Sequence, residues 1–179
     1  MIVDEAYIDF GGETALPLID KYDNLVVVRT FSKSRSMAGL RIGYAISNSE
    51  LIKALNDVKY SYNSYTMNRP SLVLGVESIH DDAYFREKVG QIIATRERFV
   101  KEIAELGFTC LPSSANFVFA THESIPAKEI FAAAKENNIY VRYFDKPRID
   151  NYLRISIGTD AEMDAFVAFL KGYVETKQN

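Results

Sequence analysis

The spacing of apolar residues changes several times along the chain, and each spacing predicts a different element. Three consecutive valines at positions 26–28 predict a short buried strand, because β-branched side chains pack well on a pleated surface. Residues 2–3 predict a strand that leads into the core, and residues 44–46 predict another. Residues 16–22 predict a short helix. The first part of the chain is therefore expected to mix strands with helices.

Helical spacing dominates the middle of the chain. Residues 51–58 follow Ser47-Asn48-Ser49-Glu50, which predicts a capping box with Ser47 as the N-cap. A second helix is expected from Pro70 to about His80. A long helix of about 25 residues is expected to begin at Asp82 and to end before Gly107, because apolar side chains recur along one stripe.

The last part of the chain alternates between short strands and helices. Strands are expected at residues 108–111, 116–120, 139–144 and 152–157, with a helix that begins near Pro126. Thr159-Asp160-Ala161-Glu162 predicts a second capping box, which opens the final helix. Two helices over a small sheet are typical of an α+β unit.

The composition argues against several classes of partner. The net charge of the 179 residues is −3, without a basic run, so neither nucleic acid nor an anionic membrane is an expected partner. Cys110 is the only cysteine, which excludes an internal disulfide and is typical of a reducing cytoplasm. His80 and His122 have no second ligand at metal-binding spacing, so no metal site is expected.

The strongest candidate for chemistry follows the valine strand. Lys33 stands where this strand leaves an apolar core, and partial burial favours a neutral amine that can condense with an aldehyde. Thr30 and Ser32 supply hydroxyl groups, and Arg41 supplies a planar fork of donors, which together suit a phosphate. The candidate ligand therefore carries an aldehyde and a phosphate. The alternative is an ordinary surface lysine and arginine on a turn.

These residues also carry a family resemblance. Thr30-Phe31-Ser32-Lys33, followed by Ala38-Gly39-Leu40-Arg41-Ile42-Gly43-Tyr44, resembles the cofactor-lysine segment of fold-type I aminotransferases, most closely their histidinol-phosphate branch. The resemblance implies pyridoxal 5'-phosphate as the cofactor, bound covalently by Lys33. It also implies an α/β fold class, with part of the large cofactor-binding domain over residues 1–95 and a smaller C-terminal α+β domain over residues 96–179.

Asp4-Glu5-Ala6-Tyr7 resembles a second motif of that family. The resemblance implies that Asp4 faces the ring nitrogen of the cofactor and that Tyr7 faces its phenolic oxygen. A carboxylate beside the ring nitrogen keeps it protonated, which strengthens the ring as an electron sink. The alternative is an exposed acidic pair beside a packing tyrosine.

Two arginines are candidates for substrate binding. Arg142 and Arg154 both lie in strand-like apolar runs, where an unpaired guanidinium is costly and an anionic partner is expected. In the resembling family, the pattern around Arg154 carries the arginine that binds the anionic group of the substrate, and Arg142 corresponds to a second cation. A structural salt bridge to an acidic residue is the alternative for each.

The implied activity is transamination from a small-molecule amino donor, histidinol phosphate, to a 2-oxo acid, in the cytoplasm and as part of histidine biosynthesis. The enzymes that the chain resembles are roughly twice as long and form homodimers, so we expect this chain to be a C-terminal half that is inactive alone. The alternatives are a pyridoxal-phosphate decarboxylase of a phosphorylated amino acid and a folded fragment without catalysis. One departure from the family pattern is Arg35, which we expect to add a cation near the phosphate.

Overall fold

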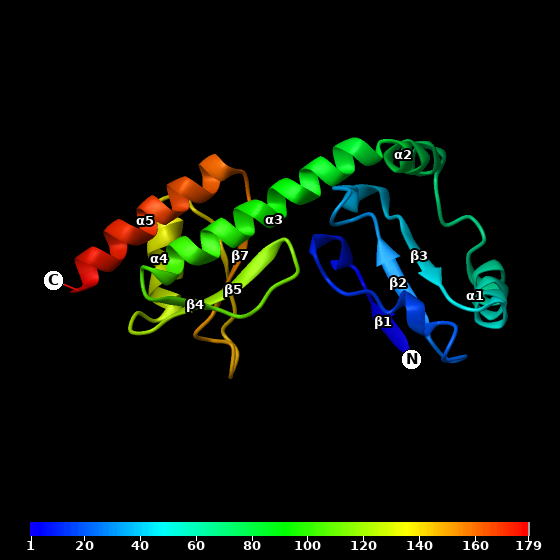
Figure 1. Cartoon of the computed structure of the whole chain (residues 1–179), viewed down its shortest axis with the longest axis horizontal. Coiled ribbons are helices and arrows are strands. Elements are labelled where there is room, and N and C mark those ends of the chain that lie inside the picture. Colours follow the sequence, from blue (N-terminus) through cyan, green and yellow to red (C-terminus); the bar gives the residue numbers. More distant parts are fainter. Residues whose placement is uncertain (179) are drawn as a thin grey trace. The chain divides into compact units, whose positions relative to one another are not determined.

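The computed structural model describes residues 1–178, which form two compact units. The first unit covers Met1–Val89, and the second begins at Gly90, inside helix α3 (Asp82–Ala104). Each unit has its own sheet (Figure 1). The mixed helix-and-sheet fold expected from the sequence is confirmed, whereas the domain boundary after residue 95 stays a prediction. No helix within residues 1–178 has both the length and the apolar character needed to cross a membrane.

The first unit contains a three-stranded sheet in the order β1-β2-β3. The valine run forms its central strand, in which Val27 is fully buried. β1 pairs with β2 in parallel, and β2 pairs with β3 antiparallel. The strand bounds are Ile2–Asp4 for β1, Val26–Thr30 for β2 and Gly43–Ile46 for β3.

Two expectations for the start of the chain are wrong. The strand expected at residues 2–3 forms as β1, but its first residue, Ile2, was expected in the core and is 72% exposed. Residues 16–22 form only a 3-10 turn, Leu16–Leu18, followed by further turns, because so short a segment gains too few hydrogen bonds to offset helix nucleation. Two more 3-10 turns occupy Ile8–Phe10 and Ala38–Leu40.

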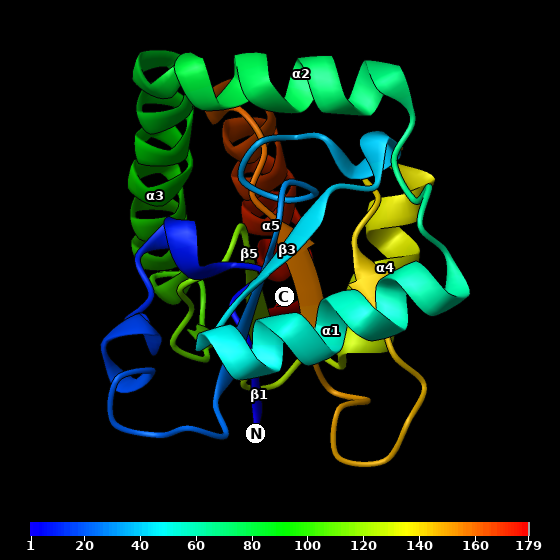
Figure 2. The ribbon, with the colours of Figure 1, turned by 90° about the vertical axis from the view of Figure 1, so that its right-hand side faces the viewer.

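Two helices complete the first unit: α1 (Ser49–Tyr62) and α2 (Arg69–His80). The N-cap of α1 is Asn48, not Ser47, since the Asn48 side chain accepts a hydrogen bond from the Leu51 N–H. The Ser47 hydroxyl instead donates to the carbonyl of Leu25, at 2.5 Å. α2 lies beyond the carboxyl end of β2 (Figures 1 and 2), where the candidate lysine is found.

The second unit contains a four-stranded antiparallel sheet in the order β4-β5-β7-β6. Its first, second and last strands along the chain lie close to their expected positions. The strand expected over residues 139–144 is shorter, because the Ile139 N–H still donates to the carbonyl of Ala134, near the end of α4 (Ala127–Glu136). The bounds are Phe108–Cys110 for β4, Phe117–His122 for β5, Arg142–Tyr143 for β6 and Leu153–Ser156 for β7.

One face of this sheet packs into the core of the second unit. In β5 and β7 the buried residues alternate with half-buried ones, so the two faces of each strand differ. The helices that contribute to the core are the later turns of α3, α4 (Ala127–Glu136) and α5 (Asp160–Gln178). Its largest fully buried side chains are Phe99, Ile103, Ile130, Leu153, Ile155 and Leu170.

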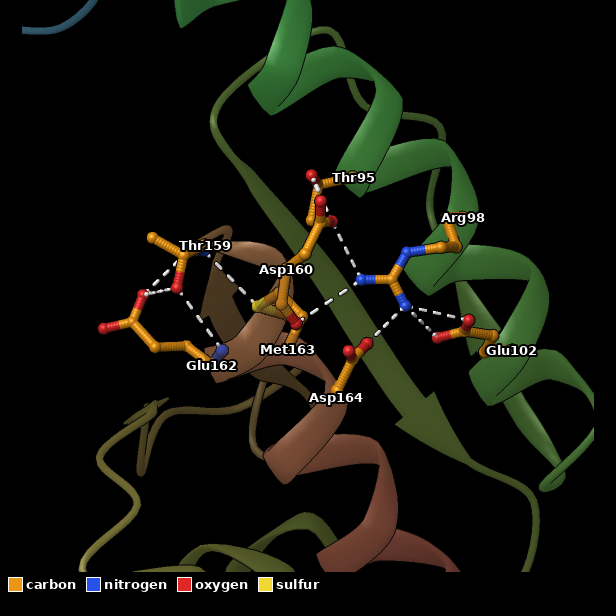
Figure 3. Close-up of polar contacts among 9 residues, drawn as sticks. Thr95, Arg98, Glu102, Thr159, Asp160, Glu162, Met163 and Asp164 are labelled. Atoms are coloured by element: carbon orange, nitrogen blue, oxygen red, sulfur yellow. Dashed lines mark hydrogen bonds and ion pairs between the residues drawn. The ribbon is translucent and has the colours of Figure 1, made fainter.

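Polar contacts fix the start of α5 against α3 (Figure 3). The predicted capping box is confirmed, because the Thr159 N–H donates to the Glu162 carboxylate at 2.7 Å and the Glu162 N–H donates to the Thr159 hydroxyl at 3.4 Å. The Arg98 guanidinium contacts three carboxylates, and its hydrogen bond holds the pKa of Asp160 below its usual value. These ion pairs therefore hold the first turn of α5 against α3.

Candidate functional site

The first candidate site lies at the carboxyl ends of β1 and β2. The two strands are parallel and Asp4 pairs with Val28, so the segments that follow the two strands leave the sheet at the same edge. Asp4 is the last residue of β1, and Thr30 is the last residue of β2. Ligands of open α/β sheets bind at such edges, outside the carboxyl ends of the strands.

The hydroxyl groups predicted to bind phosphate lie together. The oxygens of Thr30 and Ser32 are 2.8 Å apart, and the Ser32 N–H donates to the Thr30 hydroxyl oxygen at 3.0 Å. The Thr30 hydroxyl is also 3.1 Å from the carbonyl oxygen of Ile42, the residue after Arg41. The segment that leads into β3 therefore places Arg41 beside the end of β2.

Arg41 has an unusual backbone conformation. Its φ of 57° lies in the left-handed region, which is uncommon for a residue with a side chain. The side chain is exposed, and Nη1 donates to the Ala38 carbonyl at 3.0 Å. Arg41 is the C-cap residue of the 3-10 turn Ala38–Leu40, so this conformation ends that turn, and the role of Arg41 stays a prediction.

Lys33 and Tyr7 are brought into contact although 26 positions separate them. The Lys33 Nζ lies 5.4 Å from the centre of the Tyr7 ring, and both residues are half-buried. Asp4 is exposed, and its Oδ1 accepts a hydrogen bond from the Ala6 N–H at 3.0 Å, in the turn that leads to Tyr7. A carboxylate, a phenol, an amine, two hydroxyls and a guanidinium thus share one edge of the sheet.

A buried ion pair behind this edge was not predicted. Glu5 is 6% exposed and accepts two hydrogen bonds from Arg29, at 2.8 and 3.0 Å. Burial raises the pKa of Glu5, but hydrogen bonds from the Ala15 N–H, Arg29 and Thr14 outweigh it and hold the pKa below its usual value. The available signal was an arginine inside an apolar strand, which requires an anionic partner.

Replacement of Glu5 by glutamine is expected to lower the free energy of unfolding at pH 7 by about 2–3 kcal/mol, since Arg29 loses the negative charge of its carboxylate partner. Because the folded-state pKa of Glu5 is depressed, its contribution is complete above the ordinary value of 4.5 and is lost as the pH falls through the folded-state pKa. Urea titrations at several pH values measure the difference, which should shrink below pH 4.5. Glu13→Gln, an exposed neighbour, should change stability by less than about 0.5 kcal/mol. An equal difference at every pH would contradict the assignment.

Arg35 does not join the hydroxyl groups of Thr30 and Ser32. Its guanidinium packs on the rings of Phe31 and Phe85 and donates to the backbone carbonyl of Ser78. The expectation that Arg35 adds a cation beside these hydroxyls is therefore not supported by its contacts.

The second candidate site lies on the sheet of the second unit. Arg142 and Arg154 are direct register partners on β6 and β7, so their side chains project from the same face. The neighbours of Arg154 along its strand, Leu153 and Ile155, are buried, and the two arginines therefore lie on the face opposite the core. Within residues 1–178, neither guanidinium forms a salt bridge, so the structural alternative finds no support in the contacts of the described chain.

Aromatic rings surround the two arginines. The Arg154 guanidinium lies 4.2 Å from the centre of the Phe117 ring, and that of Arg142 lies 5.5 Å from the Phe144 ring. Phe119, which pairs with Arg154 in register, stacks on Tyr152 at 4.6 Å. Like charges directly opposite one another are unfavourable, and an anion between them would remove the repulsion. Sequence spacing placed both arginines in strands but did not reveal this pairing.

A comparison with models of protein families shows which family the chain belongs to. The model of the aminotransferase class I and II family matches residues 1–170. This chain belongs to the class I and II aminotransferases. The resemblance expected from the cofactor-lysine segment is therefore confirmed for the family.

Several relatives of this aminotransferase chain carry a more specific name. A histidinol-phosphate aminotransferase of Brachyspira hyodysenteriae is 51% identical over 96% of this chain and 49% of that protein. The crystal structure of the histidinol-phosphate aminotransferase from Clostridium acetobutylicum has a TM-score of 0.87 and 27% identity, covering 98% of this chain and 54% of that one. The chain thus spans about half the length of the curated relatives it matches.

A further structural relative contains the expected cofactor. The histidinol-phosphate aminotransferase from Sinorhizobium meliloti, solved in complex with pyridoxal-5'-phosphate, has a TM-score of 0.81 and 28% identity. The matched region covers 98% of this chain and 48% of the Sinorhizobium meliloti chain. The fold expected for this aminotransferase chain, part of a fold-type I transferase, is confirmed by these structures.

Proposed function

We propose that the whole protein transfers an amino group from histidinol phosphate to a 2-oxo acid, with pyridoxal 5'-phosphate as its cofactor. One observation carries the proposal: an amine, a hydroxyl pair, a guanidinium and a carboxylate share the edge where β1 and β2 end. The donor set fits a ligand with an aldehyde, a phosphate and a protonated ring. The names of relatives about half identical to the chain support the amino donor.

Each residue of this edge has a defined task in the proposal. Thr30, Ser32 and Arg41 bind the phosphate, the hydroxyls as single donors and the guanidinium as a fork. Asp4 holds a proton on the ring nitrogen, and Tyr7 donates a hydrogen bond to the phenolic oxygen. The cofactor, when bound, supplies an electron sink for the carbanion that forms at the substrate.

Lys33 has two tasks. Its Nζ would hold the cofactor by condensing with the aldehyde group, with release of water. With the substrate amine in its place, the freed Nζ would act as a general base toward the proton on the substrate carbon that bears the amine, and then as a general acid that delivers the proton to the cofactor carbon. The Nζ lies 5.4 Å from the centre of the Tyr7 ring, so the amine and the phenol are close enough to contact the same ligand.

Arg142 and Arg154 bind the anionic group of each substrate in this proposal. Two guanidinium groups on register partners present donors to the same side of the sheet, and guanidinium geometry accepts either a phosphate or a carboxylate. The donor and the acceptor can therefore use the same residues in turn. We also propose that the protein is cytoplasmic and acts as a homodimer, as the family resemblance implies.

Amino-transfer assays on the whole protein test the proposal. Histidinol phosphate with 2-oxoglutarate and added cofactor is expected to yield glutamate, and no glutamate should form when either substrate is omitted. A second assay with O-phosphoserine distinguishes the decarboxylase alternative, which would release carbon dioxide without a 2-oxo acid. Carbon dioxide release without glutamate formation would overturn the proposal, as would a protein that binds no cofactor.

A further inference from the structure

Helix α2 packs on the segment that follows Lys33 through one stripe of small residues. Ser71 is 1% exposed, and its hydroxyl donates to the Leu40 carbonyl at 2.8 Å. One turn later, a Cβ added at Gly75 would lie 2.9 Å from the Ile42 Cδ1, so the absence of a side chain at Gly75 leaves room for the end of the Ile42 side chain. Ser78 follows three positions further on the same face. One face of α2 therefore contacts the segment that follows Lys33 at three positions, Ser71, Gly75 and Ser78.

Arg35 makes the third contact of this stripe. Its guanidinium donates to the backbone carbonyl of Ser78 and lies 3.3 Å from the Ser78 hydroxyl. The same group lies 4.1 Å from the centre of the Phe85 ring and 5.3 Å from that of Phe31. Phe85 belongs to the first turn of α3, so one side chain joins the lysine segment to two helices.

The acidic residues near Arg35 do not hold it. Glu77 and Asp81 line the same cavity, of about 380 Å³, but within the described chain neither forms a salt bridge with Arg35. The guanidinium is positioned by rings and a carbonyl, which contact its planar surface and its fork. An ammonium group has neither feature, so lysine reproduces these contacts only in part.

The backbone around Arg35 transmits this constraint to Lys33. The Ser36 N–H donates to the Lys33 carbonyl at 3.1 Å, and the Met37 N–H donates to the Phe31 carbonyl at 3.0 Å. Ser36 has a φ of 55°, in the left-handed region, so the turn is held in a costly conformation. Arg35 lies directly before these two donors in the chain. Its contacts with Phe31, Phe85 and the Ser78 carbonyl therefore help to keep the turn in this conformation.

We propose that Arg35 is a positioning residue that fixes the turn after Lys33 against α2 and the start of α3 and so sets the direction of the Lys33 amine. The effect on catalysis rests on the proposed function, because the direction of the amine matters only if Lys33 bonds to the cofactor. The effect on the turn does not depend on it.

Hydrogen exchange without cofactor tests the structural step. In the whole protein, Arg35→Ala is expected to speed exchange of the Ser36 and Met37 amides on the order of tenfold, because the turn opens more often. Arg86→Ala is the matched control: Arg86 follows Phe85 on α3, is exposed, and pairs with Asp82 instead. It should leave these amides unchanged. Unchanged exchange in Arg35→Ala would overturn the proposal.

Kinetics and absorption of the loaded protein test the catalytic step. Arg35→Ala is expected to lower kcat about tenfold, with KM for the amino donor within about twofold, since proton transfer needs an aligned amine and substrate binding does not. The pH dependence of the visible absorption of the lysine-bound cofactor should shift as well. Arg35→Lys keeps the charge and should show the same changes in smaller measure, and it serves as the test if Arg35→Ala does not fold.

The outcomes separate the two proposals. Faster exchange together with lower kcat and shifted absorption supports the positioning role. Faster exchange with kcat and absorption unchanged would mean that Arg35 only stabilises the turn, which overturns it. A parent protein that binds no cofactor would refute the proposed function, while the exchange experiment would still report on the turn.

Discussion

Lys33→Ala is expected to abolish amino transfer by the whole protein, with a loss in kcat of about 10³-fold or more. The variant loses both the covalent attachment of the cofactor and the proton carrier at the α-carbon, and removal of such groups has effects of this size. Steady-state assays with histidinol phosphate and 2-oxoglutarate measure the loss. Lys33→Arg keeps the positive charge but cannot condense with an aldehyde, so it should be equally inactive.

Chemical labelling locates the reactive amine independently of turnover. Borohydride reduction of the loaded protein, followed by peptide mapping, should place the pyridoxyl group on Lys33. Lys21→Ala, which removes an exposed lysine from the same unit, should keep full activity and labelling. A label on any other lysine, or activity retained in Lys33→Ala, would refute the assignment.

Arg154→Ala is expected to lower kcat/KM for histidinol phosphate about 10²-fold. A guanidinium that forms charge-assisted hydrogen bonds to a substrate anion contributes a few kcal/mol, and each 1.4 kcal/mol corresponds to a factor of about ten. Arg154→Lys keeps the charge without the fork and should lose about tenfold. Lys171→Ala, an exposed cation on α5, is the matched control and should leave kcat/KM unchanged.

A stability measurement distinguishes this role from a structural one. Because Arg154 faces Arg142 across the strands and forms no salt bridge within residues 1–178, its removal relieves a repulsion. The free energy of unfolding of Arg154→Ala should therefore stay within about 1 kcal/mol of the parent, allowing for the lost contact with Phe117. Strong destabilisation together with unchanged kcat/KM would contradict substrate binding.

The sequence predicted the elements whose cause is local. The valine run gave β2, the apolar stripe gave the 23 residues of α3, and the spacing of Thr159 and Glu162 gave the cap of α5. These features depend on residues within a few positions of one another, so periodicity and capping chemistry suffice to predict them. The cofactor-lysine segment is local as well, and it was the strongest of the motifs that led to the correct family.

The same reasoning failed where a distant residue competed for a local group. Ser47 has the right spacing for an N-cap, but its hydroxyl bonds to the carbonyl of Leu25, and Asn48 caps α1 instead. Ile2 has the pattern of a buried strand but lies on an edge strand. Local propensity sets which residues can cap or be buried, whereas tertiary contacts select among them.

What the sequence by itself determined is the set of chemical groups and the strands and helices that carry them. Only the tertiary structure decided which groups meet: Glu5 with Arg29, Lys33 with Tyr7, Arg142 with Arg154, and Arg35 with the far end of α2. Each pairing joins residues more than ten positions apart, and it follows from strand order, register and helix packing. Those are properties of the folded chain as a whole, because the free energy that fixes them comes from burying many side chains at once.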